Sequence, residues 1–162
     1  MLRNLPPAWV IVASVSAVLS AVADLQAADK GTLPAPRVAV EFRLAENEPG
    51  AELIGMPIGD TDEQIYVTKT AALENGDIAK AEARRSELDR VSYDVQIEFT
   101  PAGAKKMEAI TGANLGKRLA ILIDGKVLSA PKLLEKISSR AVITGRISAD
   151  EARRIARGIV QP

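Results

Sequence analysis

Neither cysteine nor histidine occurs among the 162 residues of the chain. The absence of cysteine excludes disulfide bonds and thiolate metal sites, and the absence of histidine removes the most common general base and transition-metal ligand. Basic and acidic residues number 21 each, so no broad electrostatic field would attract nucleic acid or anionic lipid. We therefore expect a protein that is not an enzyme and that uses no metal, other cofactor or nucleic acid.

Aromatic residues make up only 3% of the chain, so aliphatic side chains must fill the core. The length suits one compact domain with an N-terminal addition. Arg3 gives that addition a short basic region, and Ala8 to Val22 is apolar or small throughout. The small residues of Ala21-Val22-Ala23 suit cleavage, and Leu25-Gln26-Ala27 is a weaker alternative. This pattern predicts a secretory signal peptide over residues 1–23.

The apolar run would extend only about 22 Å as a helix, short of a hydrocarbon core of roughly 30 Å. We therefore expect cleavage and an exported protein, periplasmic or otherwise extracytoplasmic, whereas an uncleaved signal would tether the chain to the membrane. Residues 24–37 are expected to be a flexible leader because they mix Ala, Asp, Gly and Pro without a period. Residues 38–162 are expected to form the folded domain.

Alternating apolar residues predict three strands, at 38–44, 64–70 and, most clearly, 93–99. The stretch 45–63 between the first two is rich in proline, glycine and acidic residues, so we expect a long surface loop there.

A β-hairpin is predicted in the second half of the chain. Residues 119–123 are apolar on both faces, as expected for a covered strand, and Asp124-Gly125 favours a two-residue turn into a returning strand at 126–129. Ala130-Pro131 would end that strand, and a further short strand is expected at 141–144.

Three helices are expected from their N-terminal signals. Asn75 can cap a short helix, Thr100 and Pro101 can begin one that ends at Gly112, and Ser148 can cap the last one. Two strand-helix-strand units can be drawn from the resulting order of elements. It predicts an α+β fold, a ferredoxin-like sandwich with an antiparallel or mixed β-sheet and helices on one face.

Ser129 with Lys126 or Lys132 could be read as a Ser–Lys nucleophile pair of a hydrolase. Residues three apart on a strand point to opposite faces, which disfavours Lys126, and nothing nearby suggests an oxyanion hole or a desolvated lysine. We therefore favour a structural role for this segment.

The acidic residues around the expected loop could bind a divalent cation, but their spacing does not match a calcium-binding loop, and solvated charge is the simpler interpretation. They are Glu46, Glu48, Glu52, Asp60, Asp62 and Glu63.

Residues 112–117 (GANLGK) superficially resemble a phosphate-binding loop. They lack the hydroxyl residue and the following helix of such a loop, so we do not interpret them as one.

Basic residues recur on the polar sides of two expected helices. We interpret them as solvated helix faces, with a peptide- or lipid-facing patch as the alternative. They are Lys105, Lys106, Arg153, Arg154 and Arg157.

A series of motifs in order carries a resemblance to a known family. The segment "FTPAGAKKMEAITGANLGKRLAILIDGKVLSAPKLLEKI", followed by "AVITGRISADEARRIA", resembles the head part of the first periplasmic domain of the SecD and SecDF protein-export membrane proteins. The motif residues that we expect to be structural are Gly103, Asn114, Gly116, Lys117, Arg118, Asp124, Gly125, Pro131 and Gly145.

The resemblance implies a ferredoxin-like head outside the membrane, near the exit of the Sec channel, that holds or guides unfolded polypeptide. In the family, a transmembrane bundle with proton-carrying acidic residues drives the movement. This sequence has no counterpart of that bundle or of the companion base subdomain, so energy coupling is not carried over.

Two functions follow as hypotheses. The first is a stand-alone SecD-type binding module that contacts unfolded or extended polypeptide through a sheet edge or a groove beside the helices, with Sec translocase components as candidate further partners. The second is a structural adaptor that docks one specific protein at the outer face of the inner membrane.

Overall fold

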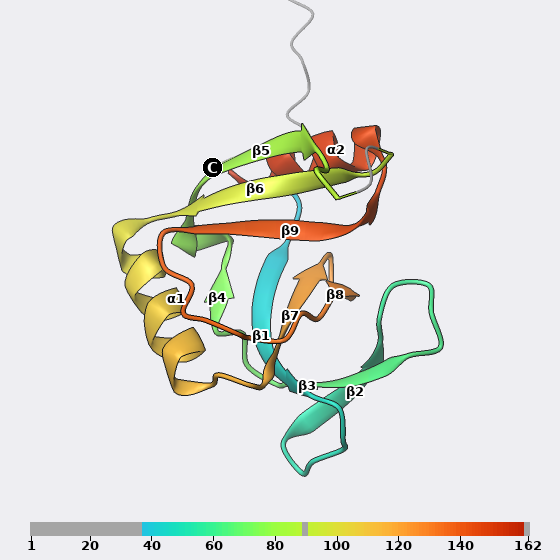
Figure 1. Cartoon of the computed structure of the whole chain (residues 1–162), viewed down its shortest axis with the longest axis vertical. Coiled ribbons are helices and arrows are strands. Elements are labelled where there is room, and N and C mark those ends of the chain that lie inside the picture. Colours follow the sequence, from blue (N-terminus) through green and yellow to red (C-terminus); the bar gives the residue numbers. More distant parts are fainter. Residues whose placement is uncertain (1–36, 89–90, 161–162) are drawn as a thin grey trace, which may run out of the picture. The chain divides into compact units, whose positions relative to one another are not determined.

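The computed structural model describes residues 37–88 and 91–160, and the expected signal peptide and all but the last residue of the expected leader lie outside this part of the chain. The described part is an α+β fold with two antiparallel sheets and two helices, which confirms the predicted class (Figure 1). Its elements are β1 (Val40–Glu46), β2 (Leu53–Pro57), β3 (Gln64–Thr68), β4 (Leu73–Glu74), the 3₁₀ turn η1 (Asn75–Asp77), β5 (Ile78–Arg85), β6 (Tyr93–Phe99), α1 (Pro101–Ala113), β7 (Arg118–Ile123), β8 (Lys126–Ser129), β9 (Arg140–Ile147) and α2 (Ala149–Ile159).

The larger sheet has the strand order β2-β3-β1-β7-β8, and β4 also pairs with β1. This sheet curls until its two edge strands meet, because Ile58, just after β2, forms a parallel bridge with Val127 of β8. Gly59 N donates to Val127 O at 2.7 Å. The curled sheet encloses a small apolar cluster of Ala45, Ile65, Val67, Ala120, Leu122, Val127 and Ala130.

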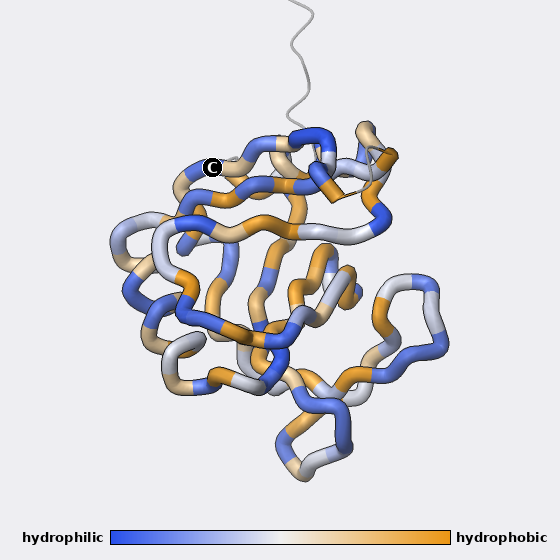
Figure 2. Tube along the Cα trace, in the orientation of Figure 1, coloured by the Kyte–Doolittle hydropathy of each residue, from blue (hydrophilic) through white to orange (hydrophobic). Residues whose placement is uncertain are grey.

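The smaller sheet has the strand order β5-β6-β9. Helix α2 packs mainly against β5 and to a lesser extent against β6, so it lies under the edge of this sheet (Figure 1). Side chains from both sheets and both helices form the main core, in which Phe42 and Phe99 meet edge to face at 5.7 Å. The alternation of hydrophobic and hydrophilic residues along β6 is visible in Figure 2, and Val95 and Ile97 point into the core.

The helix expected to begin at Asn75 is wrong. Residues 75–77 form a single 3₁₀ turn and residues 78–85 form β5, which pairs with β6 with one register shift between Ile78 and Lys80. Alanine, lysine, glutamate and arginine favour a helix locally, but the ladder to β6 and the burial of Ile78 outweigh that preference.

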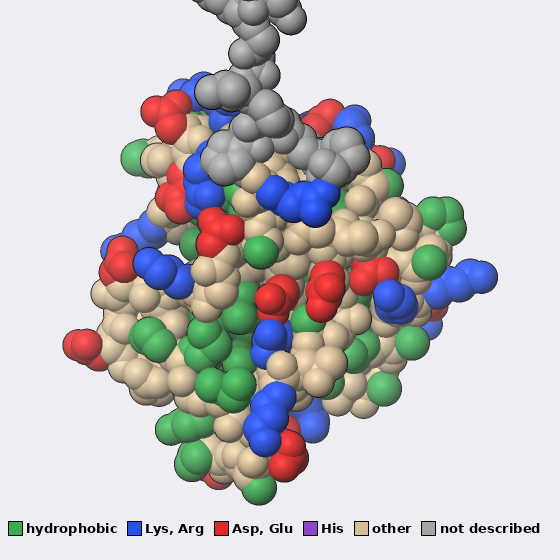
Figure 3. All heavy atoms as spheres, turned by 180° about the vertical axis from the view of Figure 1, so that it is seen from behind, with side chains coloured by type: hydrophobic (Ala, Val, Ile, Leu, Met, Phe, Trp, Pro, Cys, Tyr) green, Lys and Arg blue, Asp and Glu red, His purple; other side chains and the backbone are tan. Residues whose placement is uncertain are grey.

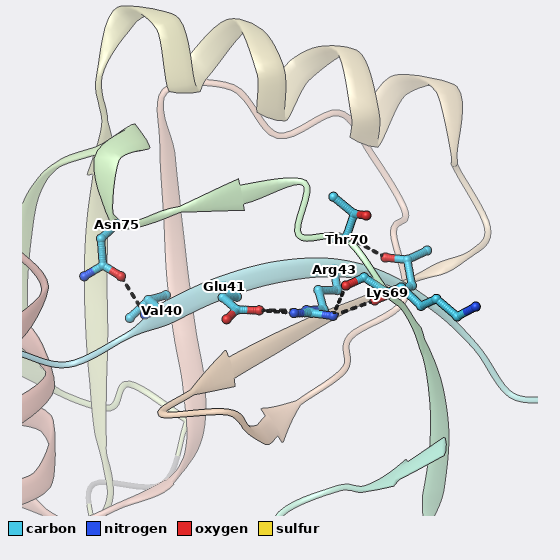
Figure 4. A network of polar contacts seen from close by, with 7 residues as sticks. Val40, Glu41, Arg43, Lys69, Thr70 and Asn75 are labelled. Carbon is cyan, nitrogen blue, oxygen red and sulfur yellow. Dashed lines mark hydrogen bonds and ion pairs between the residues drawn. The ribbon is translucent and has the colours of Figure 1, made fainter. Parts of the chain in front are cut away.

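Asn75 itself connects separate elements instead of capping a helix. Its side-chain oxygen accepts a hydrogen bond from Val40 N at 2.8 Å, and its side-chain nitrogen donates to Val38 O at 2.8 Å and to Ile159 O at 3.0 Å. One amide side chain therefore links the start of β1 to the end of α2. Figure 4 shows its contact with Val40.

The loop expected over residues 45–63 is also wrong in part, because β2 lies within it and pairs with β3 from Leu53↔Thr68 to Pro57↔Gln64. Pro57 is tolerated because β2 is an edge strand, where a missing amide need not break the ladder. The short strand expected at 141–144 is confirmed and is longer, since β9 extends from residue 140 to residue 147.

Helix α1 begins as expected, with Thr100 as its N-cap and Pro101 in its first turn, and it extends one residue beyond Gly112. Thr100 Oγ1 accepts a hydrogen bond from Gly103 N at 3.0 Å. Thr100 N donates to Asp77 O at 2.8 Å, so the helix start contacts η1. Gly103 permits this approach, because a Cβ atom there would lie 2.3 Å from Asp77 O.

We expect Gly103→Ala to destabilise the fold by about 1–3 kcal/mol, because the new methyl group would overlap a backbone carbonyl. Gly145→Ala is the matched control, since a Cβ atom at that position would make ordinary contact with Leu128 at 3.5 Å. It should change the free energy of unfolding by less than about 1 kcal/mol. Urea denaturation of both variants measures the difference, and equal midpoints would contradict the close approach at Asp77.

Candidate functional site

The motif segments around residues 114–131 form one extended hairpin. Asp124 and Gly125 both have left-handed backbone, with φ of 49° and 77°, which confirms the two-residue turn between β7 and β8. Beyond β8 the two chain segments remain paired, since Leu119 N donates to Pro131 O at 2.9 Å. Arg118 Nη1 donates to Ala130 O at 2.8 Å and joins the same two segments through a side chain.

The remaining motif residues lie at turns and close contacts. Asn114 caps α1 and its side-chain nitrogen donates to Ile110 O at 2.8 Å. Gly116 follows with a φ of 86°. Lys117 pairs with Glu46 at 3.1 Å. Gly145 lies in β9, and none of these motif residues lines either of the two hollows described below.

Ser129 does not form the pair that a hydrolase would need. Its hydroxyl oxygen is buried and makes no hydrogen bond to any described residue. Neither Lys126 nor Lys132 therefore contacts it as a base.

The acidic residues around β2 do not assemble into a metal site. Within residues 37–88 and 91–160 no group of three carboxylates is placed to hold a metal ion. Glu46 and Glu52 form ion pairs with Lys117 and Lys69 instead. Acidic and basic side chains are interspersed on the rear of the molecule (Figure 3), so that face offers no uniformly basic surface for nucleic acid.

A hollow of about 400 Å³ lies between α1 and the segment that connects β3 to β4, and it is lined by Leu44, Glu52, Thr68, Lys69, Thr70, Ala71, Ala72 and Ile110. Its backbone acceptors are already occupied, because Arg43 Nη1 donates to Thr68 O at 2.8 Å and to Lys69 O at 2.6 Å (Figure 4). The Arg43 guanidinium also pairs with Glu41. This hollow therefore has few free backbone groups for a ligand.

The edge strand β5, in contrast, has backbone groups that are free of hydrogen bonds to other described strands. Ser86 N, just beyond β5, donates to Ser92 O at 3.0 Å. Bonded and non-bonded pairs alternate along an antiparallel ladder, so Lys80, Glu82 and Arg84, which share the register of this pair, bond to β6. The backbone N–H and C=O groups of Ala81, Ala83 and Arg85 face the other way.

The pairing of β6 with β9 independently indicates which residues of β6 bond to β5. Phe99 N donates to Ser139 O at 2.9 Å, so the odd-numbered residues of β6 bond to the β9 side and the even-numbered ones bond to β5. Among the described residues no strand pairs with the outer side of β5. We call the unpaired backbone groups of Ala81, Ala83 and Arg85 the free edge.

Two surfaces flank the free edge. On the side that faces α2, Ala81 and Ala83 are small, half-buried and packed against the main core. On the outer face there is an open hollow of about 360 Å³, lined by Lys80, Glu82, Arg84, Gln96, Ile97, Glu98, Arg140, Ala141 and Val142. The free edge therefore lies between a helix and a hollowed sheet face.

Most of the charged side chains on the outer face form ion pairs with one another. The hydrogen bond from Lys80 and then that from Arg84 lower the pKa of Glu82, and the hydrogen bond to Glu82 raises the pKa of Lys80. Glu98 pairs with Arg140 across the strands at 3.3 Å. This face therefore presents paired charges and no isolated catalytic group.

The free edge was missed from the sequence, although a signal was present. Residues 79–84 read Ala-Lys-Ala-Glu-Ala-Arg and alternate small and charged side chains with the period of a strand. All of these residue types also favour helices, so the local sequence does not distinguish a strand from a helix here.

Residues 51–159 match the protein-family model described as SecDF, P1 head subdomain. The protein translocase subunit SecDF of Thermus thermophilus is 45% identical over 85 residues, which are 52% of this chain and 11% of that protein. The protein translocase subunit SecD of Aquifex aeolicus is 38% identical over 101 residues, which are 62% of this chain and 20% of that protein. The chain thus spans a small part of these relatives.

A solved structure of SecDF, described as a membrane component that enhances protein export, has a TM-score of 0.60 and 28% sequence identity, and the match covers 77% of this chain and 63% of that one. A crystal structure of SecDF in a super-membrane-facing form matches with the same TM-score over 19% of its chain. In the part of this chain that the structure describes, no helix is both long and apolar enough to cross a membrane.

The hairpin turn provides a pH-dependent test. Burial raises the pKa of Asp124, but the Arg154 guanidinium at 2.9 Å and the amide of Ala39 outweigh it and hold the pKa below its ordinary value. This carboxylate stabilises the fold above the pKa of the unfolded chain, and the contribution is lost as pH falls through the folded pKa. Because the pair is exposed, we expect about 1 kcal/mol or less at neutral pH.

Asp124→Asn keeps a side chain that tolerates left-handed backbone and removes the charge. Its urea midpoint should lie below that of the parent protein near pH 7, and the two should converge below about pH 3. A gap that stays constant over this range would show that the charge of Asp124 is not responsible.

Proposed function

Since the chain belongs to the SecDF P1 head subdomain family, we propose that it is a binding module of protein export that holds extended polypeptide along the free edge of β5. A relative is described as a membrane component that enhances protein export, which supports this setting. The chain spans 11% of the Thermus relative and 20% of the Aquifex relative, so the proposal concerns binding by one module and not the energy-coupled cycle of a whole translocase.

The observation that carries the proposal is the row of unpaired backbone groups at Ala81, Ala83 and Arg85. A chain laid antiparallel along this edge would exchange main-chain hydrogen bonds with all three residues. Main-chain pairing does not depend on the side chains of the client. Such an edge therefore suits a protein that meets many different extended polypeptides.

We further propose that the module works outside the cytoplasm, with residues 1–23 as its export signal and 24–37 as a leader. Sec translocase components are then natural partners, because the relatives are translocase subunits. No catalytic step is part of the proposal.

Ala83→Pro tests the edge at its centre. The outward amide of Ala83 is not part of the ladder to β6, so proline should leave the sheet intact while it removes one donor and places a ring on the edge. We expect affinity for reduced, carboxymethylated lactalbumin, a permanently unfolded protein, to fall about tenfold in a fluorescence anisotropy titration of the full chain.

Ala83→Ser is the matched control, because it keeps the amide and the small side chain, and its affinity should stay within about twofold of the parent. A second probe leaves the protein unchanged: a nine-residue peptide of alternating valine and glutamine should bind, and the same peptide N-methylated at every second amide should not. Equal binding of both peptides, or of Ala83→Pro and Ala83→Ser, would exclude the edge. Binding of one folded partner with no binding of unfolded chains would favour the adaptor instead.

A further inference from the structure

The two sides of the free edge differ in charge. On the outer face, every basic side chain of the hollow forms an ion pair, since Lys80 and Arg84 both pair with Glu82 and Arg140 pairs with Glu98. The face that α2 covers is less balanced, because Arg85 at the end of β5 is exposed and forms no ion pair with a described carboxylate.

Helix α2 contributes two more arginines on the same side. Arg154 points toward the larger sheet, where it pairs with Asp124. Arg153 and Arg157 are one turn apart on the flank of the helix that is turned away from this contact, and Arg157 Nε donates to Arg153 O at 3.4 Å. Arg153 also pairs with Asp150 at 2.9 Å, but the Asp150 side chain is 98% exposed, so this pair is weak.

The position of α2 places this flank beside the free edge. The helix packs mainly against β5, the outermost strand, and its sheet-facing residues are Ala152, Ile155, Ala156 and Ile159. A strand added beyond β5 would therefore lie over the flank that carries Arg153 and Arg157. Of the described residues on this side, Arg85, Arg153 and Arg157 are basic, and the only ion pair that any of them forms is the one between Arg153 and Asp150.

From this we infer that the free edge prefers extended segments with acidic side chains. The inference rests on the proposed function and specifies its client. Acidic side chains that point toward α2 would meet the surplus arginines, while the main chain pairs with Ala81, Ala83 and Arg85. The same surplus disfavours a second copy of this chain at the edge, because two β5 strands in antiparallel register would bring their arginines together.

Two nine-residue peptides test the preference, one of alternating valine and glutamate and one of alternating valine and lysine. With the full chain at low ionic strength, the glutamate peptide should bind roughly tenfold more tightly in an anisotropy titration, and 1 M NaCl should remove most of the difference. Arg153→Gln with Arg157→Gln should reduce the preference severalfold. Lys126→Gln with Lys132→Gln removes the same net charge from the hairpin of the larger sheet and should leave the preference unchanged.

The outcomes separate the inference from the proposed function. Equal binding of the two peptides, tighter binding of the lysine peptide, or an equal effect of both double variants would overturn the acidic preference while the edge remains a polypeptide site. Binding of neither peptide would overturn the proposed function and the preference together. Self-association of the full chain that Ala83→Pro abolishes would identify a second copy as the occupant and would also overturn the inference.

Discussion

The register of the pairing between β5 and β6 determines which backbone groups of β5 are available to a partner. From Lys80 to Arg85 the even-numbered residues of β5 bond to β6, so the odd-numbered ones leave their amides and carbonyls unpaired at the edge of the smaller sheet. A shift of one residue would reverse this and also turn Lys80 and Glu82 toward α2. The buried Ile78 and the half-buried Ala81 and Ala83 hold the register against such a shift.

Contacts at the start of β5 make this arrangement possible. The backbone carbonyl of Asp77 accepts a hydrogen bond from the amide of Thr100, and its carboxylate forms an ion pair with Lys106. These two contacts hold η1 against the first turns of α1. Gly103 leaves the space for that contact. Asn75 then joins the start of β1 to the end of α2. The turn that precedes β5 therefore contacts both helices, and these contacts keep α2 packed against the edge strand.

The sequence predicts the elements correctly where the preference of neighbouring residues agrees with the tertiary contacts. The alternation in β6, the turn at Asp124-Gly125 and the caps at Thr100 and Ser148 all appear in the structure, because each depends on residues close in the chain. β2 and β5 were missed because their pairing with β3 and β6 outweighs glycine, proline and acidic residues in one case and helix-favouring residues in the other. The free edge was missed with β5, since it depends on which amides the neighbouring strand leaves unpaired.

Hydrogen exchange of individual amides tests the central claim most directly. On addition of a saturating amount of the alternating valine and glutamate peptide, the amides of Ala81, Ala83 and Arg85 should exchange about tenfold or more slowly, since each would enter a new ladder. The amide of Gly55, in the edge strand β2 of the larger sheet, should be unchanged. Protection at Gly55 with none at Ala81, Ala83 and Arg85 would contradict the account and would place the polypeptide on the other sheet.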